Sequence, residues 1–317
     1  MSSTDLVVIH EHPEWQKPLF AALDRRDVRW EPFDLKSAAF SPEAVPEAKL
    51  YFNQASPSAY VRGHTRSVPL CLSYLRCLEA AGKRVLNGSR AFSLELSKSM
   101  QAALLTQLGV PTPRCIAFND VEALRVRLNG WSWPALLKPE QGGSGARMYW
   151  IESFEQLHVL LESRPDLWLP DNLLLLQQYL PHDLSRGIVR MEFLGGELLY
   201  AMRVVSHGAF NLCPSETCNP VQAEPGECAV PEARPTRGPV EFHAYPEVPA
   251  EAVKTGARIF QAAGLDVGGI EYLEHDGQRF FYDINANSNL RGPIAREHFG
   301  FDPFDRVAAW LAAQISG

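Results

Sequence analysis

The chain has 317 residues, which exceeds one average domain and allows several small lobes, each with its own core. Apolar residues make up 46% and charged residues 21%, so the composition excludes a disordered or fibrous protein. The formal net charge of -7 excludes a global attraction to nucleic acid or to an anionic membrane. Local lysines, arginines and backbone amides must therefore hold any phosphate, which favours a small phosphorylated ligand.

The first segment, MSSTDLVVIHEHPEW, has a short apolar run followed by acidic residues and a proline, unlike a signal peptide. No apolar stretch approaches the roughly 18 residues needed to span a bilayer. The sequence therefore predicts a cytoplasmic protein with neither membrane nor nucleic-acid partners. The six cysteines are too sparse for a disulfide scaffold, and we interpret them as reduced thiols. Cys213, Cys218 and Cys228 lack a close CxxC pair, which favours loop thiols over a zinc site.

Residues 1–88 alternate short apolar runs with amphipathic stretches, a pattern typical of parallel strands joined by crossover helices. The predicted strands are LVVI from Leu6, VRWEPF from Val28, LYFN from Leu50 and RVLN from Arg84. Helices are predicted over PLFAALDRR and PLCLSYLRCLEAAG, the second of which ends at Gly82. We therefore expect residues 1–88 to form an open α/β lobe.

The second predicted unit, residues 89–175, begins with SKSMQAALLTQLGVPTP, a helix that ends at Gly109 and at two prolines. A further helix is predicted near Asp120 to Leu128. The segment PALLKPEQGGSGARMYWI then predicts a strand, a glycine-rich turn and a second strand. We therefore expect these glycines to lie between antiparallel strands in a small central lobe.

The third predicted unit, residues 176–317, is introduced by the strand LLLLQQYL from Leu173. Two hairpins follow, VRMEFLGGELLYAMRVV and GIEYLEHDGQRFFYDINAN, and they predict an antiparallel sheet. Between the hairpins, residues 206–249 are irregular and rich in Pro, Glu, Cys and His, and we expect this loop to border the substrate. The elements together predict an α/β (α+β) protein.

Lys138 stands at the end of a predicted strand and is followed by PEQ and by Gly142, Gly143, Ser144 and Gly145. Glycines let backbone amides approach phosphate oxygens without steric interference, while a lysine neutralises phosphate charge. The Walker motif GxxxxGK[ST] is absent, so the segment is not a P-loop. Taken alone, a glycine-rich surface hairpin is the commoner explanation.

A second polar group occurs near the other end of the chain. Glu271 lies on one predicted hairpin strand, and Asp283, Asn285 and Asn287 lie at period-two spacing on the other, so that they share one face. Oxygen ligands without a thiol or an imidazole suit Mg²⁺, with Mn²⁺ as an alternative, bridging nucleotide phosphates. The other interpretation is an asparagine-rich strand end stabilised by turn hydrogen bonds.

The ordered set of these segments resembles the ATP-grasp superfamily, especially its branch of ribosomal-protein glutamate ligases and D-alanine ligases. The resemblance rests on Lys98 with LGVPTP, Lys138 with the glycine loop, the LLQQYL strand, Arg190, Arg203 and the acidic–Asn hairpin. It covers residues 89–289, and the preceding α/β lobe resembles the family's N-terminal domain. The resemblance implies an ATP-grasp fold. It also implies an ATP- and Mg²⁺-dependent carboxylate–amine ligase that forms an amide or peptide bond through an acyl phosphate, releasing ADP and phosphate.

The resemblance also implies roles for individual residues. The implied ATP contacts are Lys98, Lys138, Gly142, Gly143, Ser144 and Gly145 at the phosphates, and Gln178, Tyr179 and Leu180 at adenine. The implied metal ligands are Glu271, Asp283 and Asn285, and the implied catalytic residues are Lys138, Arg190 and Arg203, of which the arginines stabilise the transferred phosphate. The candidates around the acceptor are Asn211, Asn287, Asn289 and Arg291, with His207 and His243 as weaker candidates.

Some positions depart from the family's pattern. Gln178 stands where a glutamate is common, but its carbonyl can still accept a hydrogen bond from the adenine amino group. Asp283 is shorter than the usual glutamate ligand, which would weaken a second metal site. Ile188 replaces an aspartate of the glutamate ligases, and Asp183 is the candidate replacement for contact with ribose.

Two other functions fit parts of the pattern. An ATP-grasp kinase acting on a small-molecule hydroxyl would share the ATP site, but inositol phosphate kinases need a dense basic pocket where this loop has only Arg234, Arg237 and His243. A nucleotide-binding protein without catalysis should have lost the lysines or the metal ligands, and both sets are present. The expected partners are a small carboxylate and an amine, either amino acids or a peptide, and a homodimer stays open.

Overall fold

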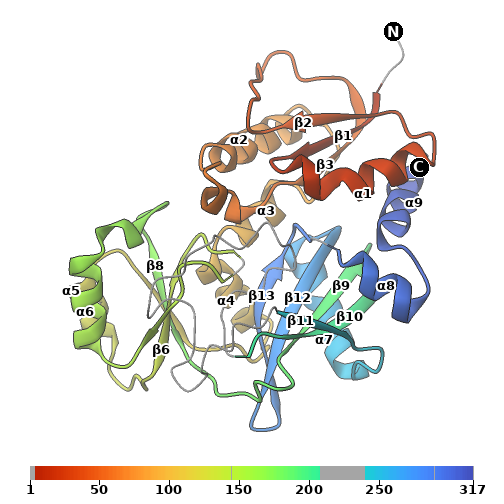
Figure 1. Ribbon diagram of the computed structural model, residues 1–317. Coiled ribbons are helices and arrows are strands. Elements are labelled where there is room, and N and C mark those ends of the chain that lie inside the picture. Colours follow the sequence, from red (N-terminus) through yellow and green to blue (C-terminus); the bar gives the residue numbers. More distant parts are fainter. Residues whose placement is uncertain (1–3, 144, 208–239, 289, 317) are drawn as a thin grey trace.

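The computed structural model describes residues 4–143, 145–207, 240–288 and 290–316. Within these ranges the strands form three sheets. Figure 1 shows the N-terminal sheet at the top, with the central sheet and the C-terminal sheet side by side below it. Among the described residues, no helix is both long enough and apolar enough to cross a membrane. The described cysteines Cys71, Cys77 and Cys115 are free thiols.

The N-terminal sheet is parallel and has the strand order β2-β1-β3-β4. Its strands are β1 (Thr4–His10), β2 (Trp30–Asp34), β3 (Ala48–Gln54) and β4 (Val85–Leu86). The connecting helices are α1 (Pro13–Asp24), the 3-10 helix η1 (Pro57–Arg62) and α2 (Ser67–Ala80). Alternate residues of β1 enter two core clusters, Leu6 and Val8 on one face and Val7 and Ile9 on the other. The parallel strands and crossover helices are therefore as the sequence pattern predicts.

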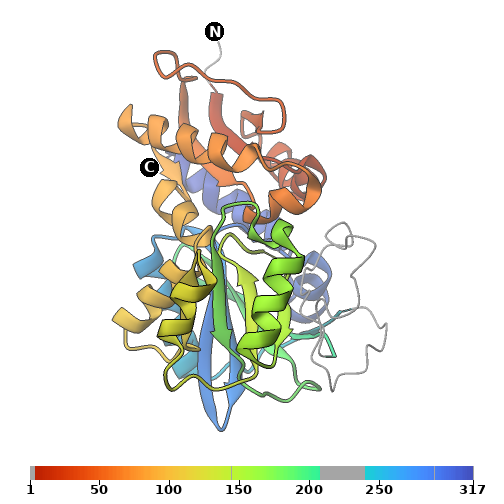
Figure 2. The ribbon, with the colours of Figure 1, turned by 90° about the vertical axis from the view of Figure 1, so that its left-hand side faces the viewer.

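The central sheet is antiparallel and has the order β5-β8-β6-β7. Its strands are β5 (Cys115–Phe118), β6 (Ala135–Pro139), β7 (Tyr149–Ile151) and β8 (Leu174–Gln178). The helices α5 (Val121–Arg127) and α6 (Phe154–Ser163) cover its outer face (Figure 2), followed by the 3-10 helix η2 (Pro165–Trp168). The pairing of β6 with β7 confirms the predicted hairpin around the glycines.

The strand β8 differs from its predicted position at the start of the third unit. It pairs with β5 and β6 in the central sheet, because Leu174 and Leu176 belong to the apolar core under α5 and α6. Sequence order places β8 directly before the C-terminal strands, but its buried side chains decide which sheet it joins. The chain therefore crosses between the two sheets immediately after Gln178.

The C-terminal sheet is antiparallel and has the order β11-β10-β9-β12-β13. Its strands are β9 (Ile188–Leu194), β10 (Glu197–Val205), β11 (Glu241–Ala244), β12 (Val267–His275) and β13 (Gln278–Asn285). Both predicted hairpins are present. The turn of the second uses Asp276 and Gly277, whose φ angles of 48° and 76° are those of a tight hairpin turn.

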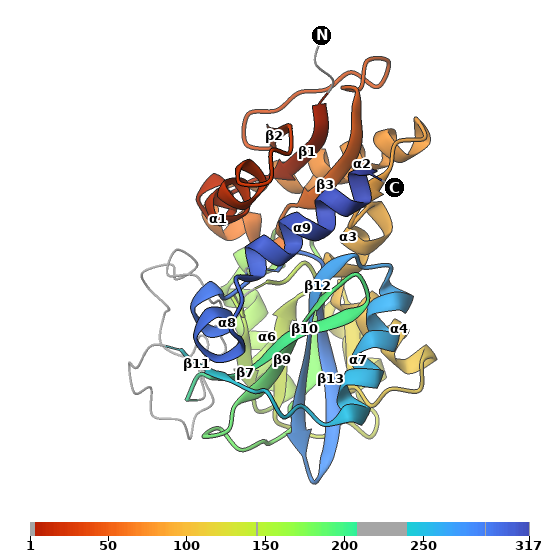
Figure 3. The ribbon, with the colours of Figure 1, turned by 90° about the vertical axis from the view of Figure 1, so that its right-hand side faces the viewer.

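The helices α3 (Ser89–Glu95) and α4 (Lys98–Gln107) were expected in the central lobe, but they pack with α7 (Ala250–Ala263) against the C-terminal sheet. The reason is that Leu94 and Leu105 enter the apolar core of that sheet. The last helices are α8 (Gly292–Phe299) and α9 (Pro303–Ser316), and α9 returns to pack on α1 of the N-terminal lobe (Figure 3). All three lobes therefore meet near α3 and α4.

Candidate active site

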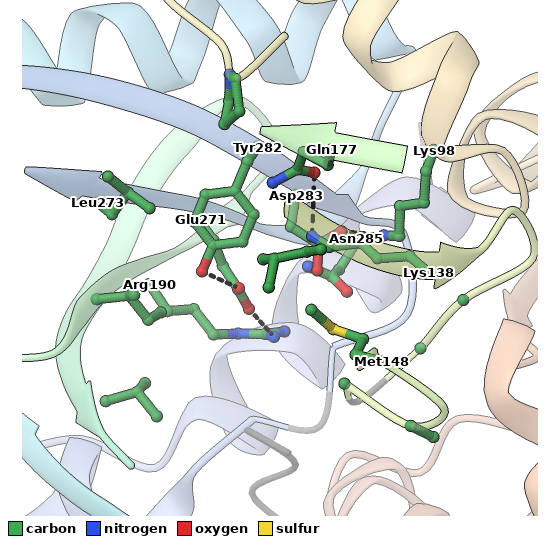
Figure 4. Close-up of a pocket in the computed structure, with 18 of the residues that line it drawn as sticks. Lys98, Lys138, Met148, Gln177, Arg190, Glu271, Leu273, Tyr282, Asp283 and Asn285 are labelled. Carbon is green, nitrogen blue, oxygen red and sulfur yellow. Dashed lines mark hydrogen bonds and ion pairs between the residues drawn. The ribbon is translucent and has the colours of Figure 1, made fainter. Parts of the chain in front are cut away.

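A pocket lies between the central and C-terminal sheets and reaches η1 of the N-terminal lobe. Its charged lining residues are Glu95, Lys98, Lys138, Arg190, Glu271 and Asp283. Its amide side chains are Gln177, Gln178, Asn285 and Asn287, and its glycine loop contributes Gly142, Gly143 and Gly145. Figure 4 shows that Lys98 and Lys138 approach from one side and Arg190 from the other. The pocket thus brings together most of the residues singled out in the sequence.

The two lysines reach the pocket from different elements. Lys98 opens α4, whose start is fixed because the Glu140 carboxylate accepts hydrogen bonds from the Ser99 amide at 3.1 Å and from the hydroxyl of Ser97 at 2.5 Å. The Lys98 ammonium forms an ion pair with Asp283. Lys138 on β6 donates to Gln177 Oε1 at 3.0 Å. Lys98 at the start of α4 and Lys138 near the end of β6 therefore bring two cations to the same pocket.

Burial disfavours the charged form of Lys138. Desolvation, with the nearby Lys98 charge, lowers the pKa of Lys138 from 10.5 to about 8. An anionic ligand beside Lys138 would stabilise its charged form. The position of Lys138 therefore favours phosphate binding over a purely structural role.

The predicted metal ligands Glu271 and Asp283 stand directly opposite each other on β12 and β13. Burial and the charge of Asp283 raise the pKa of Glu271, whose carboxylate accepts a hydrogen bond from the Tyr282 hydroxyl at 3.1 Å. Burial also raises the pKa of Asp283, but Lys98 and Lys138 outweigh this and lower it overall. Asp283 is therefore ionised, as a carboxylate must be to bind a metal, and its counter-ion in the structure is Lys98.

The donor set fits a magnesium ion better than a softer metal. Among the described residues, no group of three or more His, Cys, Asp and Glu side chains is arranged to hold a metal. The pocket offers two facing carboxylates and the side-chain amide of Asn285, which could bind a metal through its oxygen. Mg²⁺ is commonly held by one or two carboxylates and completed by phosphate oxygens and water. Glu271, Asp283 and Asn285 therefore suit a metal that arrives with a nucleotide.

Arg190 lies on β9, lines the pocket and is only 8% exposed. Its guanidinium donates to Glu192 at 2.6 Å, to Glu271 at 2.9 Å and to the Ser288 hydroxyl at 3.1 Å. Burial disfavours its charge, but Glu192 and Glu271 raise the pKa of Arg190 overall. Arg190 is thus a fixed cation beside the predicted metal ligands (Figure 4).

Glu192 was missed in the sequence, although it is fully buried and holds Arg190 in place. It also accepts a hydrogen bond of 2.5 Å from Ser288, which follows β13. The available signal was the period-two spacing of Arg190 and Glu192, which places both on one face of β9. A buried glutamate next to an arginine on one strand face is more informative than either residue alone.

Arg203 does not reach the pocket, contrary to its predicted role beside Arg190. In the β9–β10 register Arg203 stands opposite Val189, whereas Arg190 stands opposite Met202, so the two arginines point to opposite faces of the sheet. The Arg203 guanidinium lies 4.3 Å from the ring centre of Tyr245 and 3.8 Å from Glu274. Two residues on the two strands of one hairpin do not necessarily point to the same face of the sheet, because the pairing register decides which face each side chain takes.

The predicted adenine end lies where the chain leaves β8. Gln178, Tyr179 and Leu180 all line the pocket there, together with apolar side chains such as Leu136, Met148, Ile188 and Leu273. An aromatic ring system fits such an apolar slot. Asp183, the candidate for ribose contact, is exposed, does not line the pocket and accepts hydrogen bonds from Ser185 at 2.6 and 2.9 Å. Asp183 therefore stabilises a turn instead.

The glycine loop approaches the N-terminal lobe closely. A Cβ atom added at Gly143 would lie 2.8 Å from Ser58 Cβ and 3.2 Å from Ser58 N, on η1. Gly142 is also close to its surroundings, with the Pro139 carbonyl at 3.2 Å from such an atom. Glycine at position 143 therefore permits a contact between loop and N-terminal lobe that any side chain would disturb.

We expect Gly143→Val to raise the ATP concentration needed for half-maximal ADP release, because the side chain would push the loop away from Ser58 and hinder its closure over phosphate. Gly143→Ala should give a smaller increase in the same measurement. Normal ATP dependence in the valine variant would mean that the loop does not cover phosphate.

The residues predicted around the acceptor are only partly placed. Asn287 lines the pocket, whereas Arg291 does not, and its guanidinium lies 3.8 Å from the ring centre of Phe242. His207 and His243 bind Glu241 at 2.8 and 3.0 Å and do not line the pocket. The remaining candidates Ser144, Asn211, Asn289, Arg234, Arg237, Cys213, Cys218 and Cys228 lie outside the described residues.

Comparisons with known proteins agree on the fold. The D-alanine–D-alanine ligase of Bacillus anthracis has a TM-score of 0.70 at 12% identity, covering 99% of this chain and 98% of that one. A RimK domain ATP-grasp protein of Sphaerobacter thermophilus has a TM-score of 0.68 at 17% identity, covering 99% and 100%. The ATP-grasp ligase PsnB, complexed with a minimal precursor, has a TM-score of 0.63 at 20% identity, covering 99% and 100%. The chain therefore has the ATP-grasp fold, and this prediction is confirmed.

The sequence comparisons add a similarity to part of the chain. No family model matches the chain. A segment covering 43% of the chain is 28% identical over 137 residues to an N5-carboxyaminoimidazole ribonucleotide synthase of Synechococcus elongatus. The match spans 33% of the length of that relative.

Proposed function

We propose that the chain is a carboxylate–amine ligase that uses ATP and magnesium ions. The observation that carries the proposal is the convergence of Lys98, Lys138 and Arg190 on one pocket with the facing carboxylates Glu271 and Asp283. Fixed cations beside a hard-metal donor set suit the stabilisation of a phosphoryl group during transfer. The similarity of the fold to ATP-grasp ligases supports this proposal.

The pocket divides into regions that match the parts of a nucleotide. Adenine would lie in the apolar slot at Gln178, Tyr179 and Leu180. The phosphates would lie between Lys98, Lys138 and the glycine loop. A magnesium ion held by Glu271, Asp283 and Asn285 would supply charge neutralisation to the phosphates.

In the proposed reaction, a substrate carboxylate oxygen attacks the γ-phosphorus, the bond to the β-phosphate oxygen breaks, and ADP leaves with the electron pair, which gives an acyl phosphate. The amine, after losing a proton to water, attacks the acyl carbon with its free electron pair. A C–N bond forms, the C–O bond to phosphate breaks as phosphate leaves with the electron pair, and the nitrogen gives up its remaining extra proton to water. Protein groups contribute position and charge and not a covalent nucleophile. Arg190 would hold the acyl phosphate in this proposal, and the hydrogen bonds that fix its planar fork to Glu192 and Ser288 support that role.

Amino acids or a peptide are the proposed substrates, and PsnB, which was determined with a precursor peptide, illustrates the second option. A homodimer and a cytoplasmic location are parts of the same proposal. The alternative, a kinase acting on a hydroxyl, would form a phosphate ester in place of an amide. No described histidine lines the pocket except His182, which lies near the adenine end.

Removing one carboxylate should expose the metal dependence. We expect Asp283→Asn to raise the Mg²⁺ concentration for half-maximal ADP release roughly ten-fold or more, because even groups that only orient metal ligands change metal affinity by about this factor. The matched control is Asp276→Asn, since this exposed aspartate lies in the turn of the same hairpin and asparagine tolerates its φ of 48°. Identical magnesium titrations of the two variants would indicate that Asp283 only shapes the hairpin.

The experiment that tests the function is a screen of amino-acid pairs for ADP release, repeated with hydroxylamine in place of the amine. A ligase forms an acyl phosphate that hydroxylamine intercepts as a hydroxamate. A phosphate ester made by a kinase does not react. A hydroxylamine-resistant phosphorylated product, or AMP and pyrophosphate in place of ADP and phosphate, would contradict the proposal.

A further inference from the structure

Glu95, the last residue of α3, has no role in the proposed phosphoryl transfer, although it lines the pocket. Its side chain is 3% exposed. Oε1 accepts a hydrogen bond of 3.1 Å from the Asn287 amide, whereas Oε2 is buried without a hydrogen-bond partner. A buried carboxylate oxygen left in this state is costly, so it calls for a function.

Asn287 supplies a second acceptor at the same place. Its Nδ2 donates to the Gln54 carbonyl at 2.9 Å, which orients the amide and leaves Oδ1 as the unused end. Oδ1 is also buried without a hydrogen-bond partner. Because the Asn287 amide binds Glu95 directly, the two unsatisfied oxygens belong to one corner of the pocket.

This corner lies where the three lobes meet. α3 packs against α2 of the N-terminal lobe and against α4, α7 and β13, and Figure 1 shows it between the N-terminal and C-terminal sheets. The nearby hydroxyls of Ser56 and Ser58 in the N-terminal lobe are bonded to each other at 2.8 Å. The Lys98 ammonium is paired with Asp283. Asn287 Oδ1 is therefore an unused acceptor. Glu95 Oε2 is a second one in the ionised carboxylate, a form that burial disfavours by raising the pKa of Glu95 to about 8 and that a cationic ligand would stabilise.

The chemistry of the corner selects its ligand. Two acceptor oxygens repel a phosphate or a carboxylate, and a hydroxyl has a single proton to offer them. An ammonium group carries three donors and a positive charge, which matches a carboxylate and a carbonyl oxygen together. We propose that Glu95 and Asn287 bind the ammonium group of the acceptor substrate.

This inference rests on the proposed ligase function and narrows its acceptor to a primary amine that enters as a cation. The amine would lie beside the N-terminal lobe, because Asn287 also donates to the Gln54 carbonyl of that lobe. The same geometry disfavours an anionic kinase acceptor such as an inositol phosphate, because its phosphate groups would be repelled by the two acceptor oxygens.

The test compares a neutral with a cationic nucleophile. Hydroxylamine is mostly uncharged near neutral pH, whereas glycine and methylamine are cations at the amine. With ATP and the acid found in the screen, Glu95→Gln should raise the half-saturating concentration of glycine or methylamine about ten-fold or more, as expected for a lost charged hydrogen bond. Hydroxamate formation should change far less, because hydroxylamine does not need the carboxylate charge.

Glu95→Gln is the suitable variant because its carbonyl can still accept from the Asn287 amide while its NH₂ replaces the free acceptor. Asn287→Ala should show the same selective loss and guards against misfolding of the first variant. Asp266→Asn is the control, since it neutralises a partly buried carboxylate that bonds Asn87 outside the pocket. Thermal unfolding of each variant is followed alongside.

The outcomes separate the two proposals. A parallel loss with hydroxylamine and with the cationic amines would overturn the ammonium site and assign Glu95 a structural role. An unchanged response to glycine and methylamine would overturn it as well. Absence of any hydroxamate in the unmodified protein would instead overturn the ligase function, and the acceptor site with it.

Discussion

Lys138→Met is expected to reduce ATP turnover by roughly a hundred-fold or more, because it removes a preorganised cation from the proposed phosphate site. The fold should remain intact. Burial already disfavours the charge of Lys138, so an unbranched apolar side chain of similar length fits its place on β6. ADP release measures the turnover, and thermal unfolding measures the fold.

Lys254→Met is the matched control for this variant. Lys254 lies exposed on α7 and does not line the pocket, so its loss should leave turnover within about two-fold, as for most surface substitutions. Normal turnover in Lys138→Met would remove the assignment of the phosphate site. A fall in both variants would point to the net charge of the protein and not to the pocket.

The hairpins and the chemistry at their ends could be predicted from the sequence, because each depends on local pattern. Gly195-Gly196 and Asp276-Gly277 interrupt alternating apolar strands and allow positive φ. Period-two spacing likewise placed Asp283, Asn285 and Asn287 toward one pocket. These features need no knowledge of distant partners.

The predictions that the structure does not bear out concern pairing between segments that are distant in the sequence. Arg203 was assigned to the pocket because it lies on the same hairpin as Arg190, but the strand register turns it to the other face. β8 was assigned to the wrong sheet because its partners lie earlier in the chain. Glu95 was missed because its significance arises only where α3 meets the segment after β13.

Several charged side chains of the pocket form ion pairs with one another. Lys98 pairs with Asp283, and Arg190 pairs with Glu271 and Glu192. Phosphate binding would compete for Lys98 and free Asp283 for a metal ion. Metal and nucleotide should therefore bind cooperatively, because each releases a partner for the other.

Arg190→Ala is expected to lower hydroxamate formation roughly 10² to 10³-fold, the loss typical of removing one donor to a developing anionic centre. Binding of ATP should fall much less, because Lys98 and Lys138 hold the phosphates in this proposal. The variant also leaves Glu192 and Glu271 as buried carboxylates without their counter-ion, so stability should fall by about 3 to 5 kcal/mol.

The stability loss has to be separated from the catalytic loss. Arg190→Lys retains a cation between Glu192 and Glu271 but cannot reproduce the planar fork that also reaches Ser288. We therefore expect Arg190→Lys to recover most of the thermal stability and little of the hydroxamate yield, measured at saturating ATP. Since the lysine variant keeps the charge, a full recovery of yield would show that charge alone suffices and that the orientation fixed by Glu192 is not used. An Arg190→Ala variant with normal hydroxamate formation would contradict the placement of the acyl phosphate at this arginine.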